Sequence, residues 1–534
     1  MLARAALALL LIAAPAAAQD LPADQAVLKA HIQFLASDAM RGRKAGSAEY
    51  DIAAEYMAAQ MAARGLKPGA NGGWFQPVKL ATYKPSEKAK WTLRRGGAEL
   101  PFLFGKEFVN GTGAGGPSFA AEGGLVFAGY GLVYPQGRID DYKGLDVRGK
   151  IVAVFSGVPK GLPNEVAAHF SDDDQKAVNA EARGARAVIL LESAATRAQY
   201  PFEAIQPFWD YARSGWADPQ GKISVPAPGA PFAGYVSQAG AEKLFAGSRV
   251  KWADVLAAEK AAGALPRGAL TGTLAVSTRI SVQTTDTKNV IGLLEGSDPV
   301  LKHEYIVLSA HLDHVGVGDP VNGDRIYNGA MDNAAGNSMM LEVARAFQAS
   351  GKRPRRSILF ISLAAEEIGL IGSDYFAHLP VVPKESIVAN VNMDMPILTY
   401  PLEDVVVLGG ERSTLGPVIA AAAATEGLKV VPDPAPEEMF FVRSDHYSFV
   451  KAGIPAVSID SGPGGAGDAA QKKFLAENYH KPSDQIDLPF DWNSVAKFAR
   501  LNYAVARALA DADQRPRWNK GDFFGLQFKG YGAK

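Results

Sequence analysis

Beyond residue 284, short runs of consecutive apolar residues alternate with longer stretches in which apolar residues recur at helical spacing. The apolar runs have the length of buried strands and lie at 304–310, 357–363, 386–393, 404–408 and 455–460. The stretches of helical period lie at 334–349, 369–379, 415–426, 445–452 and 493–511. This alternation predicts an α/β domain whose largely parallel central sheet is covered by helices on both faces.

A helical pattern also runs through residues 24–67, near the start of the chain. A polar turn at 37–43 interrupts this pattern and carries the two arginines Arg41 and Arg43. Solvent exposure is the simpler prediction for both guanidinium groups, because arginine is rarely buried. The alternative is that the two arginines hold a substrate carboxylate.

The middle of the chain has a different sequence pattern, in which glycine residues interrupt the apolar runs. Strands are predicted at 125–131, 149–155 and 185–191, and a helix at 175–184. Residues 195–270 are rich in Gly, Pro and Ala, and His169 is the only histidine of the whole middle segment. Because no catalytic group of residues gathers here, we expect a small β-rich accessory domain and not a second active site.

Length and composition set further bounds. With 534 residues, the chain is too long for one ordinary core, and two or three domains are expected. A formal net charge of −1 provides no basic surface for nucleic acid. The chain contains no cysteine, so disulfides are excluded and any metal must be held by His, Asp and Glu.

The first residues have the pattern of an export signal. Arg4 supplies the positive charge, residues 5–14 are apolar, and three small alanines at 16–18 precede Gln19. The apolar run is too short to span a bilayer, although an uncleaved membrane anchor is the alternative. We therefore expect cleavage after Ala18 and a periplasmic or secreted protein without stable membrane insertion. Loss of Arg4 takes the net charge from −1 to −2.

Titratable residues follow the predicted strands one after another. His311, Asp313 and His314 come directly after the strand at 304–310. The later strand ends and the loops beyond them carry Asp332, Glu366, Glu367, Asp394 and His480. Each of these has a simpler alternative as a helix cap, a helix start or a turn residue. Ligands bind at the carboxyl edge of open α/β sheets, so this series predicts a functional site.

The residue types match the needs of a pair of divalent ions. Two ions about 3.5–4 Å apart can polarise a carbonyl group and generate hydroxide from bound water. One carboxylate must bridge such a pair, and each ion also needs one histidine and one further carboxylate. A carboxylate that binds no metal must serve as general base. The adjacent Glu366 and Glu367 can divide these two roles.

The same segments resemble peptidase family M28, the co-catalytic zinc aminopeptidases. The resembling segments follow the family's order between residues 285 and 512, and they are Ser-Ala-His311-Leu-Asp313, Met-Asp332-Asn333, Ala-Glu366-Glu367-Ile-Gly, Asn-Met-Asp394 and Tyr479-His480-Lys. The resemblance implies the zinc-exopeptidase fold, of phosphorylase/hydrolase-like architecture, with a mostly parallel sheet flanked by helices. It also implies two zinc ions: His311 and Asp394 would hold one, Glu367 and His480 the other, and Asp332 would bridge both.

The resemblance further implies roles for three residues that bind no metal. Glu366 would be the general base and proton shuttle, and Asp313 would orient the first histidine ligand. Tyr479 matches the tyrosine that donates a hydrogen bond to the oxyanion in family members. The Ser-Asp-His segment at 444–446 resembles the aminopeptidase branch, and the preceding apolar residues 439–441 would line a side-chain pocket.

These observations predict a domain order. The expected segments are a signal peptide at 1–18, an N-terminal part of the peptidase domain at 19–116, an inserted β-rich domain similar to a protease-associated (PA) domain at 117–272, the M28 peptidase domain at 273–512 and a tail at 513–534. The tail is basic and aromatic, and its sequence does not say where it packs.

We therefore expect an exported two-zinc aminopeptidase that acts on peptides. One alternative is a carboxypeptidase or dipeptidase of the same fold, which would need a cationic clamp from Arg41, Arg43, Arg412 or Arg443. Less favoured are a glutaminyl cyclase, which uses one zinc, and a non-catalytic binding protein. The complete ligand set and Glu366 argue against both. The oligomeric state and the native metal are not predicted.

Overall fold

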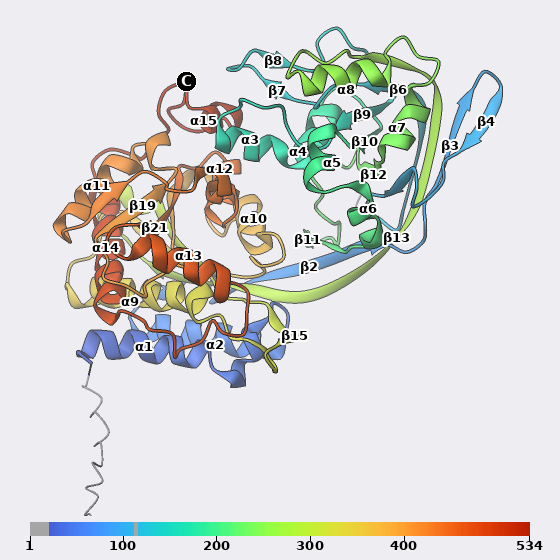
Figure 1. Ribbon diagram of the computed structural model, residues 1–534. Coiled ribbons are helices and arrows are strands. Elements are labelled where there is room, and N and C mark those ends of the chain that lie inside the picture. The colour runs from blue at the N-terminus through green and yellow to red at the C-terminus, as the bar shows by residue number, and fades with distance from the viewer. Residues whose placement is uncertain (1–20, 112–115) are drawn as a thin grey trace, which may run out of the picture.

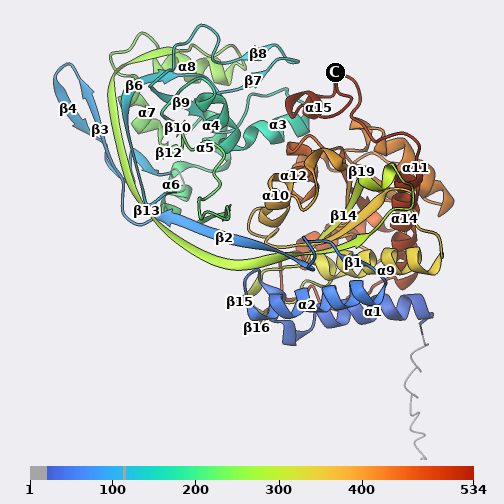
Figure 2. The same ribbon diagram turned by 180° about the vertical axis from the view of Figure 1, so that it is seen from behind.

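The computed structural model describes residues 21–111 and 116–534, so the predicted signal peptide lies outside the described residues. The chain forms two lobes, and one long strand, β13 (Gly268–Leu294), takes part in the main sheet of each (Figure 1). From the opposite side, β2 (Phe75–Pro85) is seen to accompany β13 between the lobes (Figure 2). Among the described helices, none combines the length and the apolar character needed to cross a membrane.

The larger lobe is built on the predicted parallel sheet. Four strands are parallel neighbours, in the order β17 (Ser357–Leu363), β14 (Tyr305–His311), β18 (Ile387–Asn392) and β21 (Ala456–Ser461). The sheet is extended by antiparallel pairings of β13 with β17 and of β19 (Asp404–Leu408) with β21, and by β20 (Lys429–Val431) alongside β19. The prediction of a mostly parallel α/β sheet is confirmed.

Helices cover both faces of this sheet. On one face lie α1 (Ala23–Leu35), α2 (Ala48–Ala63), α9 (Gly336–Ala349), α11 (Leu415–Thr425) and α14 (Trp492–Asp511). On the other lie α10 (Ile371–His378) and α12 (His446–Lys451). Successive residues of β14 separate accordingly: Ile306 and Leu308 pack in the cluster of the first face, and Val307 packs in the cluster of the second. Burial on both sides explains why the strands are continuously apolar.

Some elements of this lobe were not predicted. They are α13 (Gly467–Glu477), the hairpin of β15 (Gly316–Val321) and β16 (Asp324–Tyr327), and the short β1 (Lys67–Pro68) and β11 (Arg213–Ala217). Within α13, Gly467 and Phe474 are the buried residues. A helix that buries so few side chains carries a weak apolar period, which accounts for the omission.

The smaller lobe has its own sheet. Three parallel neighbours, β9 (Ile151–Phe155), β10 (Ala187–Leu191) and β12 (Phe232–Val236), form its core. The other strands are β3 (Lys90–Arg95), β4 (Ala98–Pro101), β5 (Phe108–Asn110), β6 (Ser118–Phe127) and the first half of β13, with a small hairpin of β7 (Val133–Tyr134) and β8 (Ile139–Asp140). Residues 90–110 thus pair with this second sheet, ahead of the expected boundary at 117.

Short helices surround the second sheet. They are α3 (Asn164–Ser171), α4 (Asp173–Glu181), α5 (Ala194–Gln199), α6 (Phe202–Ile205), α7 (Gln238–Phe245) and α8 (Trp252–Lys260). The predicted strands at 125–131, 149–155 and 185–191 overlap β6, β9 and β10, and the predicted helix at 175–184 overlaps α4.

The C-terminal tail fills the seam between the lobes. Its helix α15 (Phe523–Gln527) lies beside α3 of the smaller lobe and α12 of the larger one (Figure 1). Phe524 is fully buried, with ring contacts to His169 of α3 and Tyr447 of α12. The ring of His169 also makes a 2.7 Å hydrogen bond between Nδ1 and the hydroxyl group of Tyr447. The aromatic residues of the tail therefore serve to join the two lobes.

The prediction of a solvated turn at 37–43 is half wrong. Arg41 is exposed and lies 3.4 Å from Glu49, as expected of a surface charge. Arg43 is fully buried, and its guanidinium group donates hydrogen bonds to main-chain carbonyl groups, among them those of Leu312 and Gly329. The predicted turn forms the short helix η1 (Asp38–Arg43), which packs under the hairpin of β15 and β16. The apolar pattern of the sequence does not predict this hairpin, and this is why the burial of Arg43 was missed.

Candidate metal centre

The predicted site residues come together at the carboxyl edge of the larger sheet. His311 is the last residue of β14, Glu367 follows β17, and Asp394 follows β18. Asp332 lies in the turn η4 (Ala330–Ala335) before α9, and His480 lies beyond α13. Parallel strands end at the same edge, which explains how residues far apart in the sequence meet here.

The candidate ligand atoms form two groups that share one carboxylate. The Nε2 atom of His311 lies 3.1 Å from Oδ1 of Asp332 and 3.0 Å from Oδ1 of Asp394. The Nε2 atom of His480 lies 3.2 Å from Oδ2 of Asp332 and 3.0 Å from Oε2 of Glu367. The two oxygens of Asp332 thus face different histidines. Ligand atoms of His311, Asp332 and Glu367 all lie within 4.8 Å of one another, close enough to hold a metal ion.

The charges at this edge suit bound cations. Burial lowers the pKa of His480, but hydrogen bonds to Asp332 and Glu367 outweigh it and raise the pKa to about 10. Burial also acts to lower the pKa of His311, but the charges of Asp394 and Glu366 outweigh this effect. The pKa of His311 therefore lies well above its usual value. The neighbouring carboxylates therefore favour the protonated form of both imidazoles. Metal ions replace such protons, so this donor set of imidazoles and carboxylates fits divalent metal.

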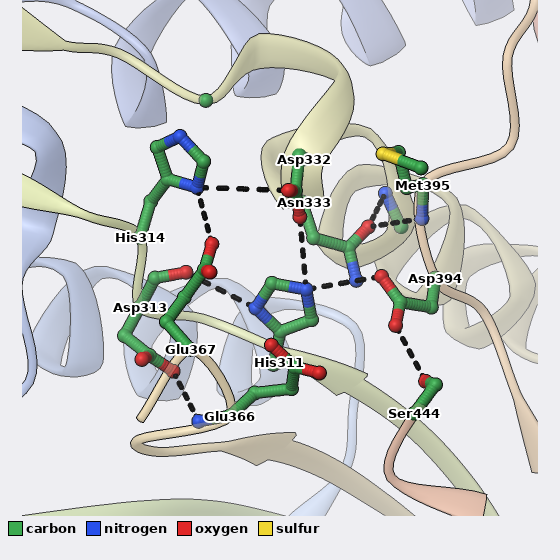
Figure 3. A network of polar contacts seen from close by, with 12 residues as sticks. His311, Asp313, His314, Asp332, Asn333, Glu366, Glu367, Asp394, Met395 and Ser444 are labelled. Carbon is green, nitrogen blue, oxygen red and sulfur yellow. Dashed lines mark hydrogen bonds and ion pairs between the residues drawn. The ribbon is translucent and has the colours of Figure 1, made fainter. Parts of the chain in front are cut away.

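Asp313 contacts the site through two different groups (Figure 3). Its main-chain carbonyl oxygen lies 3.1 Å from Nδ1 of His311, which leaves Nε2 of that histidine free to face the site. Its carboxylate oxygen Oδ1 accepts a hydrogen bond of 3.2 Å from the main-chain N–H of Glu366. The expected contact between Asp313 and His311 is present, but the carbonyl group makes it and not the carboxylate.

Glu366 faces an open cavity of about 520 Å³ that His311, Asp332, Asp394 and His480 also line. Within the described part of the chain, no side chain donates a hydrogen bond to its carboxylate. Burial, with the charges of neighbouring carboxylates, raises the pKa of Glu366 well above its usual value, against the effect of His311. The structure thus leaves this carboxylate free for a proton or a water molecule.

Tyr479 lines the same cavity beside His480. Its ring stacks on that of His480, with 3.9 Å between the ring centroids. Burial, together with the charges of Asp332 and Glu367, raises the pKa of its hydroxyl group. Tyr479 therefore remains a hydrogen-bond donor at neutral pH.

Several contacts of the site were not assigned from the sequence (Figure 3). His314 is fully buried, and its Nδ1 atom lies 2.5 Å from Oε1 of Glu367. The hydroxyl group of Ser444 donates a hydrogen bond to Oδ2 of Asp394. The carboxylate of Asp484 accepts hydrogen bonds from the main-chain N–H groups of Met331, at 2.8 Å, and of Asp332, at 3.0 Å. In the sequence, His314 lies close to His311, and Asp484 lies close to His480. This proximity to candidate ligands was the signal that could have found them.

The cavity extends away from the ligands toward α13 and the loop before α12. Phe440, Met395, Val406, Leu408 and Leu475 provide its apolar wall. Of the segment 439–441, Phe440 lines this cavity as predicted, Phe441 is buried, and Met439 lines a neighbouring cavity of about 740 Å³.

The charged lining of the cavity is mostly acidic. Beyond the candidate ligands and Glu366, its acidic lining residues are Asp433, Glu437, Glu438, Asp460 and Asp468. Of the four arginines considered as carboxylate clamps, Arg443 lines the cavity, 3.6 Å from Glu438. Arg412 lines the neighbouring cavity, where it contacts Asp522.

Part of the chain matches a known protein family. Residues 289–506 match the model of the family described as "Peptidase family M28". Leupeptin-inactivating enzyme 1 of Streptomyces exfoliatus is 30% identical over 227 residues, which are 39% of this chain and 46% of that protein. Aminopeptidase YwaD of Bacillus subtilis is 28% identical over 208 residues (38% and 40%), and a probable glutamate carboxypeptidase of Arthroderma benhamiae is 28% identical over 247 residues (43% and 31%). The chain thus spans less than half the length of these relatives.

Among solved structures, the aminopeptidase from Aneurinibacillus sp. strain AM-1 aligns over 90% of this chain and 93% of its own, at 22% identity and a TM-score of 0.47. A zinc aminopeptidase from Bacillus subtilis aligns over 91% and 95%, at 21% identity and a TM-score of 0.42. The family match covers β14, β17 and β18 and includes His311, Asp332, Glu366, Glu367, Asp394 and His480. Residues 289–506 of this chain are a domain of peptidase family M28.

Proposed function

We propose that this protein is an exported aminopeptidase that holds two zinc ions and removes N-terminal residues from peptides. The observation that carries the proposal is the placement of Asp332, whose two carboxylate oxygens face His311 and His480 separately. One ion would be held by His311 and Asp394, the other by His480 and Glu367, with Asp332 between them.

Bound zinc would supply a polarised carbonyl group and an acidic water molecule. The chain's own residues would handle the protons. Glu366 would take a proton from the attacking water and return it to the leaving amine, since its carboxylate lines the cavity beside the candidate ligands. Tyr479 would donate a hydrogen bond to the oxygen on which negative charge develops. Asp313 would position both the His311 ring and the Glu366 main chain.

The charge of the cavity favours an aminopeptidase over a carboxypeptidase. Asp433 and Glu437 line it, and no described lysine or arginine forms an ion pair with either of them. A peptide's N-terminal ammonium group would be attracted into this lining, whereas a C-terminal carboxylate would be repelled. Arg443 and Lys472 are the basic residues of the lining that support the carboxypeptidase alternative, and their contacts with Glu438 and Asp468 weaken them as clamps.

A substrate panel tests the proposal. Free aminoacyl substrates, N-blocked peptides and C-blocked peptides should be assayed with and without a chelator. We expect cleavage of free aminoacyl and C-blocked substrates, no cleavage of N-blocked ones, and loss of all activity with the chelator. Cleavage that requires a free C-terminus would establish the carboxypeptidase alternative. Activity that survives proven metal removal would exclude the mechanism.

Export and domain organisation belong to the same proposal. Residues 1–18 have the composition of a signal peptide, and intact-mass measurement of the exported protein should show Gln19 as its first residue. An exported form that retains Arg4 would contradict this expectation. The smaller lobe, with its parallel core of β9, β10 and β12, would be the PA-like insertion.

A further inference from the structure

Arg43 lies fully buried behind the candidate metal centre, where it uses every N–H group that an arginine has. Its three nitrogens donate five hydrogen bonds, all of them to main-chain carbonyl oxygens. No carboxylate of the described chain lies within ion-pair distance of it. Burying a charge without an opposite charge nearby costs free energy. The role of Arg43 is therefore to be found in the five carbonyl groups to which it donates.

One set of acceptors holds the end of strand β14. The Nε atom donates to the carbonyl oxygen of Leu312 at 2.8 Å, and Nη1 donates to that of Leu35, at the end of α1, at 3.0 Å. Leu312 lies between His311 and Asp313. The guanidinium group therefore fixes the peptide that links the first histidine ligand to the carbonyl group that orients it.

The other set of acceptors holds the turn that carries the bridging carboxylate. The Nη1 atom donates to the carbonyl oxygen of Asn328, and Nη2 donates to those of Gly329, at 2.7 Å, and Asp332, at 3.3 Å. From the opposite side, the carboxylate of Asp484 accepts the N–H groups of Met331 and Asp332. The main chain around Asp332 is thus held on its carbonyl side by Arg43 and on its N–H side by Asp484.

The turn that carries Arg43 is built to come this close. Gly42 has a φ of +68°, and a Cβ atom there would lie 2.4 Å from the carbonyl oxygen of Tyr327. The side-chain amide of Asn328 donates to the carbonyl oxygen of Ala36, at 3.0 Å, and to Asp38, at 2.9 Å. Hydrogen bonds therefore join the helix η1 and the turn before Asp332 in both directions. Arg43 of η1 donates to the turn, and Asn328 of the turn donates to Asp38 of η1.

We propose that Arg43 is a positioning residue of the metal centre. It sets the spacing between the end of β14 and the Asp332 turn, and so keeps His311 and Asp332 at metal-binding distance before metal arrives. The planar guanidinium fork suits this task, because it places several donors in one fixed plane, whereas the ammonium group of lysine has three donors at one point. This inference rests on the proposed function, since it assigns the residue a role toward the same ions.

A second buried arginine provides a matched control. Arg356 is also fully buried, and it donates to the carboxylate of Glu304 at 2.7 Å and to the carbonyl oxygens of Leu509 and Ala512. These acceptors lie at the start of β14 and the end of α14, away from the carboxyl edge of the sheet. Arg356→Lys should reduce stability for the same reasons as Arg43→Lys. Unlike Arg43, however, Arg356 donates none of these hydrogen bonds to the segments that carry the candidate ligands.

The experiment compares Arg43→Lys, Arg356→Lys and wild type in three measurements. These are zinc affinity of the metal-free proteins by competition with a chromophoric chelator, the melting temperature, and kcat and KM on a free aminoacyl substrate. Loss of a group that orients metal ligands typically costs about 10–100-fold in metal affinity or activity. We expect a loss of this size in zinc affinity and kcat for Arg43→Lys, with KM little changed. Arg356→Lys should lower the melting temperature only, and Arg41→Lys should change none of the three.

Each outcome decides the inference. If wild type binds zinc and hydrolyses the substrate, and Arg43→Lys matches it within about twofold in zinc affinity and kcat, Arg43 is only a structural residue, because a group that orients ligands has a larger effect. If wild type itself neither binds zinc nor hydrolyses the substrate, the proposed function fails, and the inference fails with it. If Arg43→Lys does not fold, Asn328→Ala decides: the inference requires weaker zinc binding at an unchanged fold, and wild-type affinity would overturn it.

Discussion

Both lobes have parallel strands with a buried or half-buried carboxylate at their carboxyl ends, but the partners of those carboxylates differ. In the smaller lobe, Glu192 directly follows β10 and is fully buried. Its oxygens accept the N–H groups of Phe202 at 2.7 Å and Gln238 at 3.2 Å, and Arg197 lies at 3.0 Å. In the larger lobe, Glu367 follows β17 and has His314 at 2.5 Å and His480 at 3.0 Å.

The two strand ends differ in the residue types that surround the carboxylate, and this difference decides whether a metal ion could bind there. The topology brings carboxylates to the same edge in both lobes. Arginine stays protonated at any physiological pH. The negative charge of Glu192 is therefore always balanced by Arg197, and this carboxylate has a structural role. Imidazole can release its proton, so the carboxylates beside His311 and His480 can exchange two protons for metal ions. Four predictions test this contrast.

Metal removal should have the largest effect. Chelation is expected to abolish peptidase activity and to lower the melting temperature, because the carboxylates of Asp332, Glu367 and Asp394 then lose the cations between them. Zinc should restore both properties. Zinc that binds only the native state contributes about 2.7 kcal/mol at 100 times its Kd. Calorimetry and turnover, with metal content measured by elemental analysis, check the prediction; an unchanged melting temperature in the metal-free protein would contradict it.

Glu366→Gln should have the next largest effect. The amide keeps the size of the side chain but cannot accept a proton, and removal of a general base typically costs about 10²–10⁴ in rate. Metal content should stay at two per chain, because no ligand is lost. Glu367→Gln should instead reduce occupancy at one site and lower the melting temperature. The opposite pattern of metal contents would exchange the roles of the two glutamates.

Glu192→Gln is the matched substitution in the smaller lobe. The N–H groups of Phe202 and Gln238 donate to different oxygens of Glu192, so the single amide oxygen of glutamine can accept only one of them, and the charged contact with Arg197 is also lost. Hydrogen bonds to charged groups contribute about 1.5–3 kcal/mol, so the free energy of unfolding should fall by at least about that much. Activity and metal content should equal those of wild type. A loss of metal would show that the two lobes are not independent in the way the contrast requires.

The smallest effect, measured per pH unit, concerns a histidine without carboxylate partners among the described residues. Burial, and to a lesser degree the charge of Lys451, lowers the pKa of His169 to about 4. The unfolded chain takes up this proton near its usual pKa of about 6.5 and the folded protein only near pH 4, so stability should fall as pH falls through this window. One such group contributes at most about 1.4 kcal/mol per pH unit. Chemical unfolding at several pH values between neutral pH and the folded-state pKa should show a flatter profile for His169→Gln; equal slopes would refute this account of His169.

Much of this molecule follows from local sequence. The continuous apolar runs predict β14, β17 and β18 because these strands are covered on both faces. The residues that follow them include the candidate ligands, since a parallel sheet gathers its strand ends at one edge. His311, Glu367 and Asp394 could therefore be assigned to one candidate site from strand ends and residue types, and all three lie within the residues 289–506 that match family M28.

Other features depend on contacts between residues far apart in the chain, which no local pattern encodes. Arg43 has the sequence context of a surface turn, yet it is buried, because its acceptors Asn328 and Gly329 lie 285 and 286 residues away. The aromatic tail contains no signal for its position, which is decided by rings from both lobes, among them His169 and Tyr447. Local sequence determines which side chains will be apolar, charged or able to bind metal. Only tertiary packing determines which charged group loses its water, because desolvation depends on what covers the group from elsewhere in the chain.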